Sequence, residues 1–242
     1  MHNALAIVKD QKILCIENKA HLSPEELQYF VPGKQGDIVQ LGNTRIGVVL
    51  CNALVDEQAH IDQLVDQGVD CIVAVTASAY ALRKPQEREQ MAILIAKKHQ
   101  VPLLFCNAVG AHDGIIFDGS SFIVDKKGMI AGRAKKFAEE VMVVQTNASG
   151  KEFTPTANQA AEVYHALTLG LRDYFSKSGF TKAVVGISGG LDSAVTAVLA
   201  VHALGTENVI GLSLPSKISS KESIQDAKQL CNNLKISLHV IK

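Results

Sequence analysis

The sequence lacks the features of a nucleic-acid-binding, membrane-spanning or secreted protein. Its 24 basic and 24 acidic side chains balance, so it has no excess of positive charge to attract nucleic acid or an anionic membrane. No apolar run approaches the ~20 residues that a membrane-spanning helix needs. The opening residues, MHNALAIVKD, contain neither a basic segment nor a long apolar one, so no secretory signal is visible. We therefore expect neither a nucleic acid nor a membrane as a partner.

The chain also lacks the cysteine pattern of a disulfide-linked or zinc-binding domain. Its five cysteines are odd in number, widely spaced and without a CxxC pair. This pattern argues against a disulfide framework and against a structural zinc site. Together with the aliphatic composition, it favours a reduced, cytoplasmic protein. The cysteines are Cys15, Cys51, Cys71, Cys106 and Cys231.

Short apolar runs separated by turn residues fill the first part of the chain, and this pattern predicts strands with two helices between them. The predicted helices cover residues 57–66 and 87–98. The predicted strands cover residues 4–8, 12–16, 38–41, 45–50, 71–75, 101–106, 114–117, 121–124 and 141–144. The polar stretch that follows, QTNASGKEFTPTAN, has no helical or strand period and is interpreted as a linker. These features predict a first domain over residues 1–145 and a linker over 146–159.

A second domain is predicted over residues 160–242, where long helices alternate with short strands. The predicted helices are 160–177, 193–204 and 221–233, and the predicted strands are 182–187, 208–214 and the final SLHVIK. This order indicates βαβ units, which form a parallel sheet with right-handed crossovers. Because the chain stops inside a strand, we expect it to be truncated at this end.

The most informative motif is SGGLDS at residues 188–193, between a predicted strand and a predicted helix. Its two glycines let the backbone bend sharply and approach a ligand closely. The helix that follows directs unpaired N–H groups and a partial positive charge at that place, which suits a pyrophosphate. Asp192 can hold a divalent cation that bridges phosphate oxygens. The alternative is a tight turn with a capped helix, but the full motif in this setting favours phosphate.

Two other phosphate-binding motifs are excluded by the same residues. The loop has no lysine of the GxxxxGK[ST] type, which disfavours a Walker-type NTPase. It does not match GxGxxG, so a dinucleotide-binding Rossmann motif has little support either.

The motif resembles the signature of the ATP-pyrophosphatase (PP-loop) enzymes, and the flanking segments resemble the NAD synthetases within that superfamily. These segments are Ala161–Phe180 and Leu214–Leu230. In the second, the residues that match the family pattern are Pro215, Ser216, Ser219, Ser220, Ser223, Asp226 and Ala227, with Ile218 in place of an aromatic residue. The resemblance implies an ATP site with Mg²⁺ at Asp192. The implied ATP-binding residues are Gly186, Ile187, Ser188, Gly189, Gly190, Leu191, Asp192 and Ser193.

Cys51 ends the apolar run RIGVVL, which would place its thiol at the rim of a sheet, where catalytic groups collect. A buried, inert cysteine is the plainer interpretation of such a residue, and it applies equally to Cys15, Cys71 and Cys106. However, the setting of Cys51 resembles the nucleophile strand in the nitrilase-like glutaminase domain of bacterial NAD synthetases. There the thiol attacks the side-chain amide of glutamine.

Further segments resemble the same glutaminase domain, in the family order. They are Asn18–Leu22, Tyr29–Gly33, Thr76–Arg88 and Asn107–Asp125. The resemblance places Lys19 in a Glu–Lys–Cys triad, and it places Ser78 and Lys84 among the residues that bind glutamine. In such a triad a carboxylate takes the thiol proton, and the lysine ammonium stabilises the developing oxyanion. Without the resemblance, Lys19 would be interpreted as a solvated loop lysine.

The chain departs from the family at several points. The catalytic glutamate of the family lies upstream of the lysine, before the place where this chain begins. The segment between Lys19 and YFVPG is a few residues shorter than usual, and Asn52 stands where the family has an acid after the nucleophile. Ala79 and Ala111 replace the usual proline and glycine. Most of the synthetase domain would follow Lys242, so we expect the isolated chain to be inactive in both reactions and poorly folded.

The sequence therefore predicts an α/β chain that is truncated at both ends. Its expected fold is a partial nitrilase-like α-β-β-α sandwich followed by the first part of a Rossmann-like PP-loop domain with a parallel sheet. The resemblance implies a glutamine-hydrolysing NAD synthase, which takes ammonia from glutamine and uses ATP to convert deamido-NAD to NAD. It also implies small-molecule substrates and a homo-oligomeric intact enzyme.

Three alternatives remain open. Another PP-loop enzyme is one, although a GMP synthetase would carry a Gly-x-Cys-x-Gly elbow and a tRNA-modifying enzyme a basic region, and neither feature occurs here. A truncated or degenerate copy that binds ATP or partners without catalysis is the second. A stand-alone nitrilase-type amidase is the third, and the SGGLDS part of the chain contradicts it.

Overall fold

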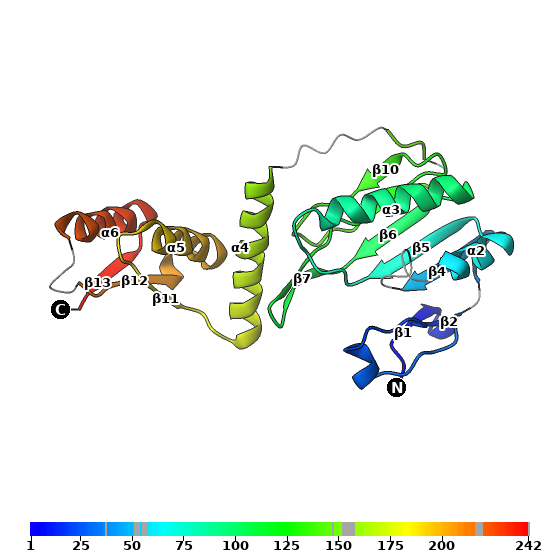
Figure 1. Cartoon of the computed structure of the whole chain (residues 1–242), viewed down its shortest axis with the longest axis horizontal. Coiled ribbons are helices and arrows are strands. Elements are labelled where there is room, and N and C mark those ends of the chain that lie inside the picture. The colour runs from blue at the N-terminus through cyan, green and yellow to red at the C-terminus, as the bar shows by residue number, and fades with distance from the viewer. Residues whose placement is uncertain are drawn as a thin grey trace. The chain divides into compact units, whose positions relative to one another are not determined.

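A computed structural model describes residues 1–36, 38–50, 54, 58–146, 148–151, 158–215 and 220–241 (Figure 1). Contacts between residues divide the chain into two compact units. The first unit comprises Met1–Val109 with Phe117–Thr156, and the second comprises Gly110–Ile116 with Ala157–Lys242.

A six-stranded mixed sheet forms the centre of the first unit, with the strand order β10-β9-β6-β5-β4-β3. The inner strands β4, β5 and β6 are parallel, and each outer pairing is antiparallel. The parallel strands are rich in Val, Ile and Leu because strands covered by helices bury long apolar runs. The strands are β3 (Val39–Leu41), β4 (Thr44–Leu50), β5 (Cys71–Thr76), β6 (Leu103–Asn107), β9 (Phe122–Val124) and β10 (Ile130–Arg133).

Two helices, α2 (Gln58–Asp66) and α3 (Lys84–His99), cover one face of this sheet (Figure 1). They bury apolar residues at helical spacing, such as Ile61 and Leu64 in α2. These side chains form one core with Ile72, Leu103, Phe105 and other residues of the sheet. The core therefore fixes α3 against the sheet.

The N-terminal strands β1 (Ala4–Lys9) and β2 (Lys12–Asn18) form a separate antiparallel pair. Asp10 and Gln11 both have positive φ, at 50° and 62°, as a tight two-residue hairpin turn requires. A short 3₁₀ helix, η1 (Glu26–Gln28), follows β2. The two strands predicted at the start of the chain are thus confirmed, and they form a hairpin.

The sequence prediction was wrong at one segment and missed two others. Residues 141–144 form no strand, and Val141 and Val143 are 95% and 94% exposed. Alternating apolar residues form a strand only where another strand pairs with them. Among the described residues, no strand pairs with 141–144. The missed strands are β10, which pairs with β9, and β7 (Val109–His112), which pairs with β8 (Ile115–Asp118).

The second unit contains a parallel sheet of β11 (Ala183–Gly186), β12 (Val209–Ser213) and β13 (Ser237–Val240), in that order. The helices α5 (Leu191–Leu204) and α6 (Lys221–Leu234) share an apolar core with it. A second short 3₁₀ helix, η2 (Thr206–Asn208), precedes β12. This parallel arrangement confirms the predicted βαβ order.

The second unit also contains α4 (Gln159–Ser178), which packs against α5. Asn158 caps the start of α4 by accepting a hydrogen bond from the N–H of Ala161, and Gly179 ends it with φ of 73°. The tip of the β7–β8 hairpin belongs to the same unit, and the Asp173 carboxylate accepts a hydrogen bond from the Ala111 N–H (2.7 Å). Neither α4 nor any other helix in the described part of the chain is long and apolar enough to cross a membrane.

Candidate functional site

The first unit contains a cavity of about 350 Å³ that includes two of the predicted glutamine-binding residues. Ser78 follows the end of β5, and Lys84 is the first residue of α3. One wall is apolar, and the rim carries Lys84 and Glu87, whose charged groups lie 3.5 Å apart. The lining residues are Leu54, Thr76, Ser78, Lys84, Glu87, Arg88, Gln90, Met91, Leu94 and Phe105. An apolar cavity with a few polar groups is the usual form of a small-molecule site.

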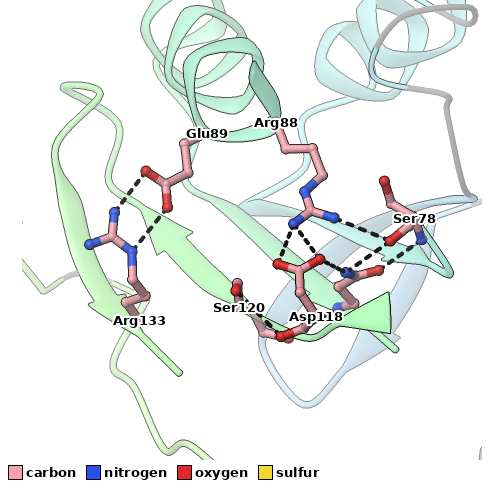
Figure 2. Close-up of polar contacts among 8 residues, drawn as sticks. Ser78, Arg88, Glu89, Asp118, Ser120 and Arg133 are labelled. Atoms are coloured by element: carbon pink, nitrogen blue, oxygen red, sulfur yellow. Dashed lines mark hydrogen bonds and ion pairs between the residues drawn. The ribbon is translucent and has the colours of Figure 1, made fainter. Parts of the chain in front are cut away.

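A buried polar network lies beside this cavity (Figure 2). The guanidinium of Arg88 binds both carboxylate oxygens of Asp118, at 2.8 and 2.7 Å. Arg88 also donates a hydrogen bond to the carbonyl of Ser78 (3.2 Å), and the Ser78 N–H donates to the side chain of Asn107 (2.8 Å). Asp118 is completely buried and Arg88 is 7% exposed, so the network is shielded from water.

Lys19 is nine-tenths buried, which contradicts its interpretation as a solvated loop lysine. Its ammonium group binds both carboxylate oxygens of Glu26, at 2.8 and 2.7 Å. Glu26 also accepts hydrogen bonds from Asn3 (3.1 Å) and from the N–H of Ser23 (2.9 Å). Burial alone would raise the pKa of Glu26, but the hydrogen bonds from Lys19 and Ser23 outweigh it and hold that pKa below its ordinary value. Lys19 is not among the residues that line the cavity at Ser78.

The Lys19–Glu26 pair predicts a pH-dependent cost for replacing Glu26 with glutamine. Because the folded-state pKa of Glu26 is lowered, the pair stabilises the fold above the ordinary carboxylate pKa and loses this effect as the pH falls through the folded value. At about pH 7 we expect Glu26→Gln to lower the free energy of unfolding by about 1–3 kcal/mol. At a pH below the folded-state pKa of Glu26, where the native carboxyl is also neutral, the difference should vanish.

Urea unfolding at the two pH values measures this effect. Glu25→Gln is the matched control because the Glu25 side chain bonds to the exposed Ser23 hydroxyl and not to Lys19. We expect it to change the unfolding midpoint little at either pH. A Glu26→Gln cost that stays the same at both pH values would contradict the ion pair.

Cys51, the predicted nucleophile, lies outside the described residues, so the structure does not place its thiol. Three other cysteines can be compared with their interpretation as buried and inert. That interpretation holds for Cys71, whose pKa is raised by burial and by the charge of Asp70. It is wrong for Cys106, which is exposed, and Cys15 is half-buried. Cys106 alternates with buried neighbours in β6, so its side chain lies on the sheet face opposite α3.

In the second unit, the SGGLDS motif joins β11 to α5 as predicted. The Ser193 hydroxyl accepts a hydrogen bond from the Ser188 N–H (3.2 Å) and donates one to the Gly190 carbonyl (3.0 Å). The Ser188 hydroxyl in turn accepts a hydrogen bond from the Gly190 N–H (3.2 Å). These bonds hold the loop in a fixed curve over the first turn of α5, where N–H groups are available for an anion.

The two glycines of the loop have different roles. Gly189 has φ of 84°, and a Cβ atom there would lie 2.3 Å from the carbonyl oxygen of Ser223 in α6. Gly190 has φ of −88°, and its nearest neighbour would be the Ser188 hydroxyl at 3.4 Å. Gly189 is therefore required by the close approach of α6, whereas the backbone at Gly190 would admit a side chain.

A second cavity of about 310 Å³ lies beside this loop, at the carboxyl ends of β11 and β12. Ligands of open parallel sheets bind at such strand ends. The lining residues are Gly186, Ile187, Ser188, Leu212, Ser213, Leu214, Pro215, Ser223 and Ile224. The first three of the predicted ATP-binding residues thus line the cavity, and the other five, Gly189 to Ser193, do not. The predicted family positions 216–219 lie outside the described residues.

Asp192, the predicted metal ligand, is exposed in the first turn of α5. Within the described part of the chain, no three His, Cys, Asp or Glu side chains are grouped to hold a metal ion. A lone exposed carboxylate beside a phosphate-binding loop fits a Mg²⁺ ion that takes most of its ligands from phosphate and water.

Sequence reasoning missed Glu26 and the Arg88–Asp118 pair. Glu26 gave little signal, since it begins the short 3₁₀ helix η1, seven residues after Lys19. Arg88 was within a quoted motif, and its position one helical turn after Lys84 indicated the same face of α3. Asp118 also lay within a motif, Asn107–Asp125, but its carboxylate could equally have belonged to a surface turn.

Comparisons with known proteins match two family models to successive parts of the chain. The chain belongs to the carbon-nitrogen hydrolase family, whose model matches residues 1–154. The NAD synthase model matches residues 163–242, after the first match ends. Both matches agree with the family resemblance given by the sequence motifs. The α/β fold class, with a nitrilase-like part followed by an NAD synthase part, is confirmed.

The particular proteins that this chain resembles contain both parts. It is 35% identical to the glutamine-dependent NAD(+) synthetase of Thermotoga maritima, over 99% of this chain and 49% of that protein. It is 38% identical to the enzyme of that name from Synechocystis, over 90% of this chain and 42% of that protein. A structure of glutamine-dependent NAD+ synthetase from Acinetobacter baumannii, in complex with ADP, aligns with a TM-score of 0.91. That match has 31% identity and covers 99% of this chain and 47% of that one. The chain thus spans about half the length of the relatives it matches.

Proposed function

We propose that this chain is part of a glutamine-hydrolysing NAD synthetase, a carbon-nitrogen ligase with glutamine as the amido donor. The observation that carries the proposal is the order of two sites along one chain. A cavity with Ser78 and Lys84 lies in a nitrilase-like unit, and a phosphate-type loop lies at the strand ends of an NAD synthase unit. The predicted domains are 1–145 and 160–242, joined by a linker over 146–159.

In the proposed glutaminase reaction, the Cys51 thiolate attacks the side-chain amide carbon of glutamine. Ammonia leaves as the amide C–N bond breaks, and water then hydrolyses the thioester to glutamate and restores the thiol. The buried ammonium of Lys19 would stabilise the oxyanion that forms on the amide oxygen. Ser78 and Lys84 would hold the amino-acid end of glutamine in the cavity that they share.

In the proposed synthetase reaction, the carboxylate of deamido-NAD attacks the α-phosphorus of ATP and releases pyrophosphate. Ammonia then displaces AMP from the adenylate to give the amide of NAD. The N–H groups at the start of α5 and the curved loop Gly186–Ser193 would bind the phosphate oxygens. Asp192 would hold Mg²⁺, which neutralises phosphate charge when it is bound.

The remaining features of the proposal rest on the sequence. A homo-oligomeric intact enzyme is inferred from the family resemblance. A cytoplasmic location is inferred from the cysteine pattern, and Cys15, Cys71, Cys106 and Cys231 are free thiols. Both inferences concern the intact protein.

The test uses protein purified from its native source. We expect it to release pyrophosphate from ATP only when deamido-NAD is present, because the adenylated carboxylate belongs to that substrate. We also expect NAD to form with glutamine as the nitrogen donor, and Cys51→Ala to remove this glutamine-dependent product. Pyrophosphate release that ignores deamido-NAD would overturn the assignment. ATP binding without any glutamine-dependent product would instead support a non-catalytic copy, consistent with Asn52 in place of the family acid.

A further inference from the structure

We propose that the buried Arg88–Asp118 ion pair, together with Asn107, positions Ser78 for substrate binding. This inference rests on the proposed function, in which Ser78 contacts glutamine. Arg88 and Asn107 hold the backbone of Ser78, and Asp118 holds Arg88. All three are therefore positioning residues that act through Ser78.

Both backbone groups of Ser78 are occupied by this network (Figure 2). Its N–H donates to the side-chain oxygen of Asn107 at 2.8 Å. Its carbonyl accepts hydrogen bonds from Arg88 at 3.2 Å and from the Asn107 amide at 3.4 Å. The Ser78 hydroxyl makes no hydrogen bond with any described residue, and Ser78 lines the cavity. The backbone is thus fixed, while the hydroxyl is left to bind a ligand.

Arg88 can fix the Ser78 carbonyl because its own position is fixed. One terminal nitrogen, Nη2, binds both oxygens of Asp118, and the other, Nη1, binds Ser78. The guanidinium is planar and rigid, so holding one of these nitrogens sets the direction of the other. The group also lies over the ring of Phe105, 5.8 Å from its centroid, which restricts it further.

The network joins three elements that meet at the edge of the cavity. Arg88 comes from α3, Asp118 ends β8, and Asn107 ends β6. The Asn107 amide also reaches Asp118, at 3.5 Å. Ser78 follows β5, the strand next to β6, so a displacement of any of these elements would move its hydroxyl.

A neighbouring ion pair that does not contact Ser78 serves as a comparison. Glu89 follows Arg88 in α3 and accepts two hydrogen bonds, at 3.0 and 2.8 Å, from Arg133 of β10 (Figure 2). Their side chains are only 14% and 16% exposed, and neither contacts Ser78. A buried ion pair is weak support for stability, because desolvation opposes the attraction. The full burial of the Arg88–Asp118 pair is better explained by its contact with a ligand-binding residue.

The inference predicts a defect in affinity rather than in the chemical step. Arg88→Lys keeps a positive charge near Asp118, but an ammonium cannot bind Asp118 and Ser78 through one rigid fork. We expect the concentration of a glutamine-shaped ligand that half-saturates the site to rise on the order of tenfold, the effect of one lost hydrogen bond to a charged group. The maximal rate of reaction at Cys51 should remain unchanged.

The experiment measures the alkylation of Cys51 by a diazo-ketone analogue of glutamine in the intact enzyme of which this chain is proposed to be part. Intact-mass spectrometry followed by peptide mapping gives the rate at Cys51 across analogue concentrations. The dependence of this rate on the analogue concentration yields a half-saturating concentration and a limiting rate. Alkylation by iodoacetamide, which does not resemble glutamine, provides the reference for thiol reactivity. Arg133→Lys is the matched control, since it weakens the neighbouring pair and leaves Ser78 untouched.

A double-mutant cycle separates positioning from general loosening. If Arg88 acts through Ser78, Arg88→Lys should have no further effect on half-saturation in a Ser78→Ala background. Asn107→Ala serves as a second variant in case Arg88→Lys does not fold, because it removes the contacts to Ser78 and keeps the ion pair. Asn107→Ala should also raise the half-saturating concentration of the analogue, and this effect should disappear in the Ser78→Ala background.

Each outcome bears on one of the two claims. The positioning role alone is overturned if Arg88→Lys and Arg133→Lys change the half-saturating concentration equally. It is also overturned if the effect of Arg88→Lys on that concentration is undiminished in the Ser78→Ala background. If the unchanged intact enzyme shows no saturable alkylation of Cys51, the proposed glutaminase function is overturned, and this inference with it. Saturation in the unchanged intact enzyme and a Ser78-dependent loss in both variants would support both claims.

Discussion

Replacing Gly189 with alanine is expected to disrupt the proposed phosphate-binding loop and to reduce ATP affinity by more than about 100-fold. The native φ of 84° is unfavourable for alanine, and the new Cβ would lie 2.3 Å from the Ser223 carbonyl oxygen and 2.7 Å from its Cα atom. Both obstacles are backbone atoms near the start of α6, so no side-chain rotation can relieve the clash. The loop or the helix must move, and either shift breaks the bonds that connect Ser188, Gly190 and Ser193.

Titration with a fluorescent ATP analogue in the presence of Mg²⁺ measures the loss of affinity, and urea unfolding measures the loss of stability. Gly190→Ala is the matched control for stability, because its φ is ordinary and its new Cβ would meet only the Ser188 hydroxyl at 3.4 Å. We expect it to change the free energy of unfolding by less than about 0.5 kcal/mol. If Gly189→Ala retained both stability and affinity, the close packing of the loop on α6 would be wrong.

Replacing Asp118 with alanine is expected to lower the free energy of unfolding by about 3–5 kcal/mol. Asp118 is fully buried, and its removal leaves the Arg88 guanidinium in the interior without a counter-charge. The carbonyl of Ser78 and the ring of Phe105 cannot compensate a full charge. Most domains have a total stability of only about 5–15 kcal/mol, so this change alone would leave the first unit marginal.

Equilibrium unfolding in urea gives the cost, and Glu89→Ala provides the comparison. Its partner Arg133 has a side chain 16% exposed and can reach water more easily, so we expect a smaller loss. The double variant Asp118→Ala with Arg88→Met should recover part of the lost stability, because it removes the unpaired charge as well. An unrecovered loss would indicate that Asp118 stabilises the fold by some means other than its pairing with Arg88.

Local chemistry was predictable from the sequence, and tertiary pairing was not. The SGGLDS loop could be predicted because its bend and its serine contacts lie within one short segment. Ser78 and Lys84 were assigned to one site by the family resemblance, and in the structure both line one cavity. By contrast, the sequence could not distinguish Gly189 from Gly190, because the difference arises from Ser223 on another helix.

The errors have the same origin. Residues 141–144 carry a strand-like alternation, but alternation says nothing about whether a partner strand is present. Strand β10, from Ile130 to Arg133, was missed because its alanine and glycine give a weak apolar pattern. Lys19 was known from its motif, yet its ion pair with Glu26 depends on how the intervening segment folds back.

The buried Arg88–Asp118 pair also constrains how this protein can change over evolutionary time. A single substitution at either position leaves a charge in the interior, so each first step towards another pair passes through a destabilised intermediate. Arg88 and Asp118 are therefore expected to be replaced together. The Glu89–Arg133 pair, whose acid follows Arg88 directly in α3, is more exposed and is therefore less tightly constrained.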